Sequence, residues 1–287
     1  MKNIMMRKLL FVFVLLFSLP TFSVQYTRLD SIKVMNLLAE VSRKSFSSPS
    51  DCALFLGRKL TGVPYVAKTL EVNKKEKLIV NLRQLDCTTF VENVVALTLC
   101  WKDKTYTFDA FCNALRKIRY KGGKTVDYTT RLHYFTGWIE DNTRLGLCYE
   151  IQSPNPPFTG KQIVDVNYMS VHPGKYPMLA HNVTNQKCIS AMERELSNKT
   201  YRYIPKPQIK NTKLLRSTIH NGDIIAIITN IKGLDTQHIG FAVWHKDGLH
   251  LLNASSIHKK VIEEPMLLSD YLQKKKTMTG IRIVRLK

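Results

Sequence analysis

The stretch Asn-Leu-Arg-Gln-Leu-Asp-Cys-Thr-Thr-Phe-Val-Glu, residues 81–92, holds the point where a strand-like apolar run gives way to an apolar helical pattern. Cys87 lies at that point, and we expect its thiol at the N-terminus of a helix that ends near Cys100. The helix dipole and free N–H groups there favour a thiolate, and the Cys87 N–H is a candidate oxyanion donor. Asp86 suits the N-cap, but its charge opposes the thiolate, so a cationic neighbour is required. Alone, such a cysteine would more often be a core residue.

Helical patterns dominate the rest of the N-terminal half, and strand patterns dominate the C-terminal part. Helices are expected over about 30–46, 49–60, 108–119, 129–145 and 267–274. Strands are expected over 78–82, 223–229, 238–245, 249–254, 261–262 and 280–286. The last run largely alternates, as an edge or barrel strand should. Helices first and an antiparallel sheet second predict an α+β fold, with a sheet or partial barrel at the C-terminal end.

Residues 150–218 are irregular and rich in proline. One helix, about Gln186 to Leu196, is expected there. We interpret the segment as a loop-rich insertion that forms walls around a site rather than a second core.

A histidine at the start of an apolar strand is the candidate base. His238 lies in Gln237-His-Ile-Gly-Phe241, and pairing it with Cys87 would give the nucleophile and base of a cysteine hydrolase. Asn253 follows on the next strand, across a hairpin turn at 246–248, so its side chain can meet His238 at the same sheet end and orient the imidazole. The alternatives are a structural histidine and a turn-capping asparagine. Seven other histidines compete, none in a metal-binding pattern.

The N-terminus is typical of a secretory signal peptide, residues 1–23. Lys2, Arg7 and Lys8 precede an apolar run, Leu9 to Leu19, and small residues follow at a cleavage site. The run is too short for a membrane anchor. We therefore expect an exported, periplasmic or extracellular protein without stable membrane insertion, and one catalytic domain over 24–287.

The charge is strongly positive. Removing the three N-terminal basic residues from the formal +21 leaves +18, which favours acidic partners. No nucleic-acid signature accompanies it, so carboxylate-rich peptidoglycan fits better than nucleic acid. None of the six cysteines forms a C-x-x-C pair, and the chemistry needs no metal or organic cofactor. A monomer is favoured.

Several motifs resemble those of the NlpC-type, papain-like cell-wall peptidases, and more closely those of the N-acetylmuramoyl-L-alanine amidase-like (AmiA-like) family of secreted bacterial proteins. The matching stretches run in order across most of the chain. They are residues 62–71, 85–92, 131–142, 221–229, 237–242 and 251–256.

The resemblance implies a nucleophile at Cys87, a base at His238 and an orienting residue at Asn253, where such proteins often carry histidine. It also implies that Tyr65 lies near the nucleophile and positions substrate or oxyanion, and that Thr88 contacts substrate or starts the helix.

Further candidates for substrate binding are Asp86, Gln237, Arg131 and Tyr134. At helical spacing, Arg131 and Tyr134 share a face with Trp138, and Arg131 could bind a substrate carboxylate bidentately. A salt-bridged structural helix is the equal alternative.

The expected reaction is acyl transfer to Cys87 followed by hydrolysis, in peptidoglycan or muropeptides. The bond is either the muramic acid–L-alanine amide or the one after γ-D-glutamate. Three alternatives stay open: a non-catalytic cell-wall binder, a thiol acyltransferase or lipid-processing enzyme, and a polyanion-binding basic protein.

Overall fold

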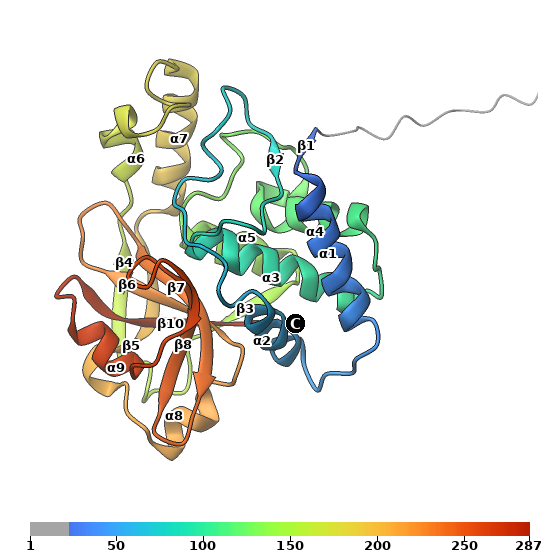
Figure 1. Ribbon diagram of the computed structural model, residues 1–287. Coiled ribbons are helices and arrows are strands. Elements are labelled where there is room, and N and C mark those ends of the chain that lie inside the picture. Colours follow the sequence, from blue (N-terminus) through green and yellow to red (C-terminus); the bar gives the residue numbers. More distant parts are fainter. Residues whose placement is uncertain (1–22) are drawn as a thin grey trace, which may run out of the picture.

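The computed structural model describes residues 23–287, so residues 1–22 of the predicted signal peptide lie outside the described residues. Helices and an antiparallel sheet form two parts of the molecule (Figure 1). The larger helices are α1 (Arg28–Val41), α2 (Pro49–Lys59), α3 (Cys87–Lys102), α4 (Phe108–Arg119), α5 (Phe135–Arg144) and α7 (Val183–Leu196). Within residues 23–287, no helix combines the length and the apolar character needed to cross a membrane.

Helix starts follow the capping residues in the sequence. Thr27 caps α1 in a capping box with Asp30, so this helix begins before the expected start at Asp30. Asp86 caps α3, and its carboxylate accepts a hydrogen bond from the Thr89 amide at 2.8 Å. Helices α2, α3 and α4 confirm the predictions for their segments.

The sheet has eight strands, in the order β4-β5-β10-β6-β7-β8-β9, with β3 also pairing with β10. All these pairs are antiparallel. The strands are β3 (Cys148–Ile151), β4 (Gly160–Val164), β5 (Lys199–Pro205), β6 (Ile224–Thr229), β7 (Thr236–Trp244), β8 (Leu249–Ser255), β9 (Lys260–Glu263) and β10 (Met278–Leu286). A separate parallel pair joins β1 (Val24–Gln25) to β2 (Leu78–Ile79). The α+β expectation is therefore confirmed.

Of the two alternatives for the last strand, an edge or a barrel strand, the edge position is wrong, because β10 is central in the sheet. Its charged residues, Arg282 and Arg285, form ion pairs with acids that are distant in the chain. Arg282 is fully buried and lies 2.5 Å from Glu150, while Arg285 lies 2.7 Å from Asp223.

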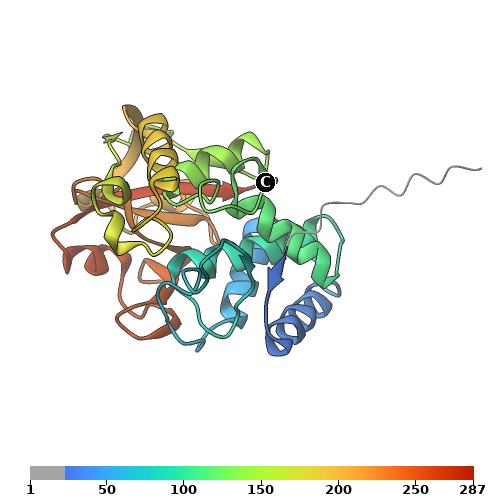
Figure 2. The ribbon, with the colours of Figure 1, turned by 90° about the horizontal axis from the view of Figure 1, so that it is seen from above.

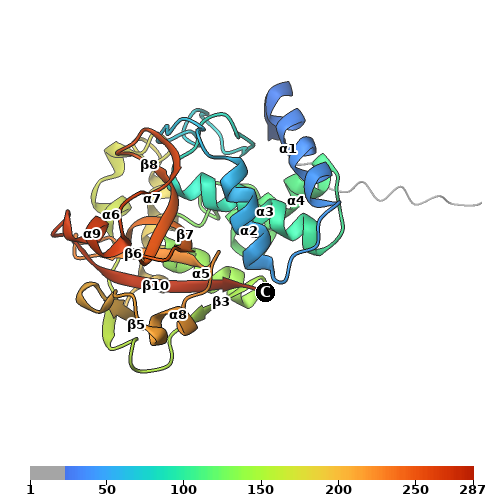
Figure 3. The ribbon, with the colours of Figure 1, turned by 60° about the horizontal axis from the view of Figure 1, so that its bottom comes forward.

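Each face of the sheet has its own apolar core. Alternate residues of β6 and β7, such as Ala226 and Phe241, pack with α2 and α3. The opposite residues, such as Ile225 and Ala242, pack with the short helices α8 (Lys213–Thr218) and α9 (Leu268–Gln273). Figures 2 and 3 show helices α1 to α4 on one side of the strands. This places the N-terminus of α3 against β7.

Residues 150–218 do more than form loops. Strands β4 and β5 extend the main sheet, and the segment contributes most of a third apolar cluster, around Met169, Leu179 and Ile189. The expectation that it lacks a core of its own is therefore wrong. The helix predicted near 186–196 is present as the longer α7.

The helix predicted over 129–145, in contrast, is shorter than expected. It begins at Phe135, and Arg131 instead forms an isolated bridge with Tyr120. The strand predicted at 78–82 is reduced to Leu78–Ile79.

Candidate active site

A cleft of about 220 Å³ lies where the start of α3 meets the start of β7. Cys87 and Thr88 line it from α3, and Gln237 and His238 line it from β7. Met169 of the short helix α6 (Tyr168–Val171) and the N-terminal part of α5 form other walls. The two residues expected to react therefore share one cleft, although 151 positions separate them in the chain.

His238 and Asn253 meet across neighbouring strands, as the hairpin predicted. The imidazole Nε2 lies 2.9 Å from the Asn253 side-chain oxygen Oδ1. The Asn253 Nδ2 donates to the Leu251 carbonyl at 3.3 Å. Because an amide oxygen only accepts, the proton of the neutral imidazole lies on Nε2, and Nδ1 keeps its lone pair. His238 therefore has the tautomer of a general base.

The surroundings of Cys87 favour the thiol. Burial and, to a smaller extent, the Asp86 charge raise the pKa of Cys87 to about 12, although hydrogen bonds from the Ile239 amide and from Thr88 act in the opposite direction. At the resting site, desolvation and the Asp86 charge oppose the thiolate that the helix N-terminus favours, in line with the expectation that a cationic neighbour is required. The contact with Ile239 places the sulfur beside the backbone that follows His238.

His238 is equally held in its neutral form. Burial lowers its pKa below the usual 6.5, and the Lys275 charge lowers it further, although the hydrogen bond with Asn253 and the charges of Asp86 and Glu264 oppose this. The resting pair is thus a thiol and an imidazole with a free lone pair. A reaction of the Cys87 sulfur at this site would require transfer of its proton to a base.

Two tyrosines interact electrostatically with Cys87. Tyr65, which the sequence indicated, pairs with Leu85 and Lys259 through its backbone. Burial and the charges of Cys87 and Asp86 raise its pKa to about 12, so its hydroxyl stays a donor. Tyr271, which sequence reasoning missed, stacks on His238 with ring centroids 6.2 Å apart. Burial, with Glu264 and Cys87, raises its pKa to about 12 as well.

The other predicted polar residues have defined places. The Asp86 carboxylate is occupied by capping the helix at Thr89. Thr88 is hydrogen-bonded to the sulfur of Cys87. The Gln237 side-chain oxygen accepts a hydrogen bond from Thr277 at 2.8 Å, which fixes its side chain at the wall of the cleft.

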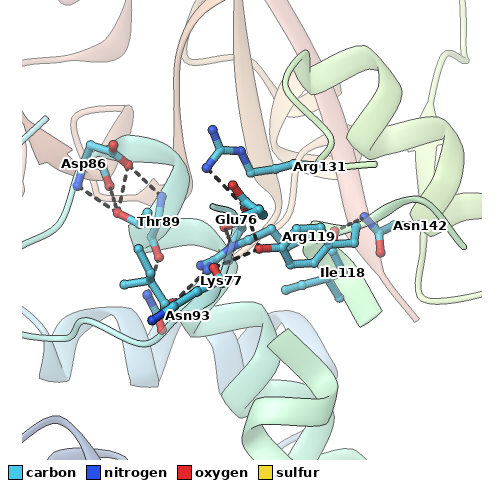
Figure 4. A network of polar contacts seen from close by, with 12 residues as sticks. Glu76, Lys77, Asp86, Thr89, Asn93, Ile118, Arg119, Arg131 and Asn142 are labelled. Atoms are coloured by element: carbon cyan, nitrogen blue, oxygen red, sulfur yellow. Dashed lines mark hydrogen bonds and ion pairs between the residues drawn. The ribbon is translucent and has the colours of Figure 1, made fainter. Parts of the chain in front are cut away.

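The Arg131 side chain is engaged in ion pairs within the protein. It is 6% exposed, and its guanidinium contacts the carboxylates of Glu71 and Glu76. Figure 4 shows the contact of Arg131 with Glu76 beside Arg119, and Arg119 lies 2.7 Å from Glu92 on α3. This buried network ties the loop before Cys87 to the helices, so the ion-paired structural alternative describes Arg131.

Tyr134 caps α5 rather than lying within it, which corrects the helical face proposed for it. Its hydroxyl donates to Glu193 at 2.7 Å, and the residue also lines the cleft. Because the hydroxyl is engaged with Glu193, only the part of the Tyr134 side chain that faces the cleft is available to contact a ligand.

Gly240 was also missed. A Cβ at Gly240 would lie 2.7 Å from the Leu252 carbonyl oxygen and 3.0 Å from the Asn253 Cβ, so only glycine lets β7 and β8 approach at the His238–Asn253 pair. The glycine in the His-Ile-Gly-Phe sequence is the signal that could have revealed this. His133 lines the cleft, and its Nε2 lies 2.7 Å from the Tyr128 carbonyl oxygen.

Comparison with solved structures identifies close relatives. An N-acetylmuramoyl-L-alanine amidase from Bacteroides uniformis is 38% identical, with a TM-score of 0.77 over 83% of this chain and 99% of its own. A Bacteroides fragilis protein that carries a xylanase name is 39% identical, with a TM-score of 0.75 over 81% of this chain and 99% of its own.

A more distant structure shares the fold. A Legionella pneumophila protein is 23% identical, with a TM-score of 0.67 over 89% of this chain and 94% of its own. No curated protein sequence is similar enough to this chain to count as a match.

The family model described as N-acetylmuramoyl-L-alanine amidase-like matches residues 55–281. This range contains Cys87, His238 and Asn253 and most of the chain. The chain therefore belongs to the N-acetylmuramoyl-L-alanine amidase-like (AmiA-like) family.

Proposed function

We propose that this chain is a cysteine hydrolase that cleaves the amide bond between N-acetylmuramic acid and L-alanine in peptidoglycan fragments. The observation that carries the proposal is the 2.9 Å contact between His238 Nε2 and Asn253 Oδ1, beside a cleft that Cys87 also lines. Family membership and the amidase name of the Bacteroides uniformis relative support the choice of bond. A helix-borne cysteine with a strand-borne histidine held by asparagine also fits the NlpC-type, papain-like arrangement, which we include in the proposal.

The first half of the reaction forms a thioester. The Cys87 sulfur attacks the amide carbonyl carbon while its proton passes to Nδ1 of His238. The C–N bond then breaks, and His238 returns this proton to the departing nitrogen. Throughout, the Nε2–H of His238 stays hydrogen-bonded to the Asn253 side-chain oxygen. This bond fixes the plane of the ring and stabilises the transient imidazolium.

The second half consumes water. Nδ1 of His238 takes one proton from water as its oxygen adds to the thioester carbonyl. The C–S bond then breaks, and the proton returns to sulfur, so the resting thiol and imidazole are restored. The products are a carboxylic acid and an amine, and no other reactant is needed.

The developing oxyanion needs donors near the sulfur. Within residues 23–287, the Cys87 N–H in the first turn of α3 has no hydrogen-bond partner, so it is available. The Tyr65 hydroxyl, kept protonated by its raised pKa, is the second donor that we propose.

Mass spectrometry of products from defined muropeptides tests the function. Release of an intact stem peptide with an N-terminal L-alanine supports the proposed bond. Cleavage after γ-D-glutamate would assign the other bond and contradict this one. Product joined to an added amine in place of water would indicate an acyltransferase.

Cys87→Ala provides the matched test of the nucleophile. We expect it to lower turnover roughly 10⁴-fold or more, whereas Cys188→Ala, at an exposed thiol that does not line the cleft, should retain full activity. Binding of muropeptides without turnover by the wild type would instead indicate a non-catalytic cell-wall binder. Equal turnover by both variants would end the assignment of Cys87.

We also propose that the protein is exported and meets its substrate outside the cytoplasm. The basic and apolar N-terminal sequence supports this. Mass spectrometry of the protein secreted by its host would check it, since cleavage after Ser23 gives an N-terminus at Val24.

A further inference from the structure

Helix α1 carries apolar side chains on both of its faces. Val34 and Leu38 are buried, and the helix packs on α2, α3 and α4. On the other face, Leu29, Ile32 and Met35 are 64%, 45% and 39% exposed. A surface helix normally presents polar residues to water, so the outer face of α1 is unusual.

The exposed residues form one surface. Leu29, Ile32 and Met35 follow one another at intervals of three, which places them on neighbouring turns of the same side. Tyr26, 49% exposed, precedes the N-cap at the same end. Of the eleven large apolar side chains exposed in residues 23–287, these four lie within ten consecutive positions. We call Tyr26, Leu29, Ile32 and Met35 the α1 patch, and such concentration is typical of an interaction site.

Positive charge flanks the α1 patch. Arg28 and Arg43, near the two ends of α1, are exposed, and neither has an ion-pair partner in the part of the chain that the structure describes. The acids of the helix are compensated, since Asp30 is buried beside Arg83 and Glu40 lies 2.6 Å from Lys59. The surface around the patch therefore attracts anions.

The position of α1 suits a docking role. No residue of α1 lines the cleft beside Cys87, and Figures 1 and 3 show this helix at the periphery of the molecule, away from the main antiparallel sheet. In the sequence, the apolar run Leu9 to Leu19 ends shortly before Arg28. Until the run is removed by the cleavage proposed after Ser23, a membrane that receives it during export is therefore close to α1.

We propose that the α1 patch docks on an anionic lipid surface. Leu29, Ile32 and Met35 enter the boundary between headgroups and acyl chains, and Arg28 and Arg43 face the lipid phosphates. A second copy of this chain fits less well, because a symmetric contact would bring the arginines of two copies together. Docking would hold the enzyme at a membrane and leave its cleft open to substrate.

Vesicle binding of the purified protein, with its N-terminus defined by mass spectrometry, tests the proposal. The probe is vesicles of phosphatidylglycerol and phosphatidylethanolamine, compared with phosphatidylcholine alone. The combined variant Leu29→Ser, Ile32→Ser and Met35→Ser should weaken binding to the anionic vesicles by at least about tenfold. The matched control changes three other exposed residues to serine: Ile163, Val171 and Ile257. It should bind like the wild type, and both should keep the wild-type melting temperature.

A second readout reports on α1 itself, whatever the N-terminus contributes. Tryptophan introduced as Ile32→Trp should gain fluorescence quenching by brominated lipids relative to the parent protein, whereas Ile163→Trp should not. The proposal is wrong if the wild type ignores anionic vesicles, or if Ile32→Trp gains no quenching. It is also wrong if the triple-serine variant changes only self-association in sedimentation, which would assign the patch to a second copy.

Discussion

Nε2 of His238 on β7 and Oδ1 of Asn253 on β8 lie 2.9 Å apart, and this contact sets the tautomer of the candidate base. Asn253→Ala removes the acceptor, so the proton can move to Nδ1 and block the lone pair that must accept the Cys87 proton. We expect kcat to fall on the order of 10²-fold with residual activity, since Asn253 orients rather than reacts. Steady-state kinetics on a muropeptide check this. Asn253→His should recover part of the loss, and unchanged kcat in the alanine variant would remove Asn253 from the site.

The pH profile of kcat/KM follows from the two neutral resting groups. His238 must be unprotonated to act as base, and burial lowers its pKa below 6.5, so activity should fall only as the pH drops below that value. Because the pKa of Cys87 is raised to about 12, no second change is expected between about pH 7 and pH 9. A resting thiolate–imidazolium pair predicts a descending limb as His238 deprotonates, which would contradict the neutral pair.

Substitution of Lys275 tests the same pH profile of kcat/KM. Its positive charge lowers the pKa of His238, so Lys275→Gln should raise that pKa and move the acid limb to higher pH. The shift should be small and should shrink with added salt, since Lys275 is exposed. Lys246→Gln, at the distant hairpin turn between β7 and β8, is the control. Identical acid limbs in wild type and Lys275→Gln at low salt would argue against a charge effect on His238.

Close approach of two strands at Gly240 predicts that alanine is not tolerated there. The added methyl would lie 2.7 Å from the Leu252 carbonyl oxygen, so β7 and β8 must separate beside His238 and Asn253. We expect a loss of about 1–3 kcal/mol in unfolding free energy and a lower kcat. Gly174→Ala, where a Cβ meets nothing within 4 Å, should change neither. Urea denaturation and kinetics of both variants would show the difference.

Local patterns predicted the parts of the structure that depend on neighbouring residues. Phe108–Arg119 is helical as expected, and Cys87 begins a helix because Asp86 and Thr89 cap it. The meeting of His238 and Asn253 followed from one short hairpin, whose register the intervening turn fixes.

The features that the sequence did not predict depend on contacts between segments that are far apart in the chain. Arg282 and Arg285 made the last strand resemble an edge, because their acids, Glu150 and Asp223, are far away in the chain. Tyr271 reaches His238 only through the packing of α9 on the sheet, which no local pattern records. The apparent helix around Arg131 failed for the same reason, since this segment pairs with Tyr120.

A variant of Arg131 distinguishes a structural role of this residue from a role in substrate binding. Arg131→Leu would remove the cation that pairs with the buried Glu76 and the partly buried Glu71, at a cost of roughly 3 kcal/mol in unfolding free energy. Arg144→Leu, which removes an arginine 62% exposed beside Asp141, should cost no more than about 1 kcal/mol. Thermal unfolding checks both values. If the guanidinium instead bound a substrate carboxylate, Arg131→Leu would raise KM sharply at temperatures where the variant is fully folded. Because the ion pairs already occupy this side chain, we expect KM to stay within about twofold of the wild type at such temperatures.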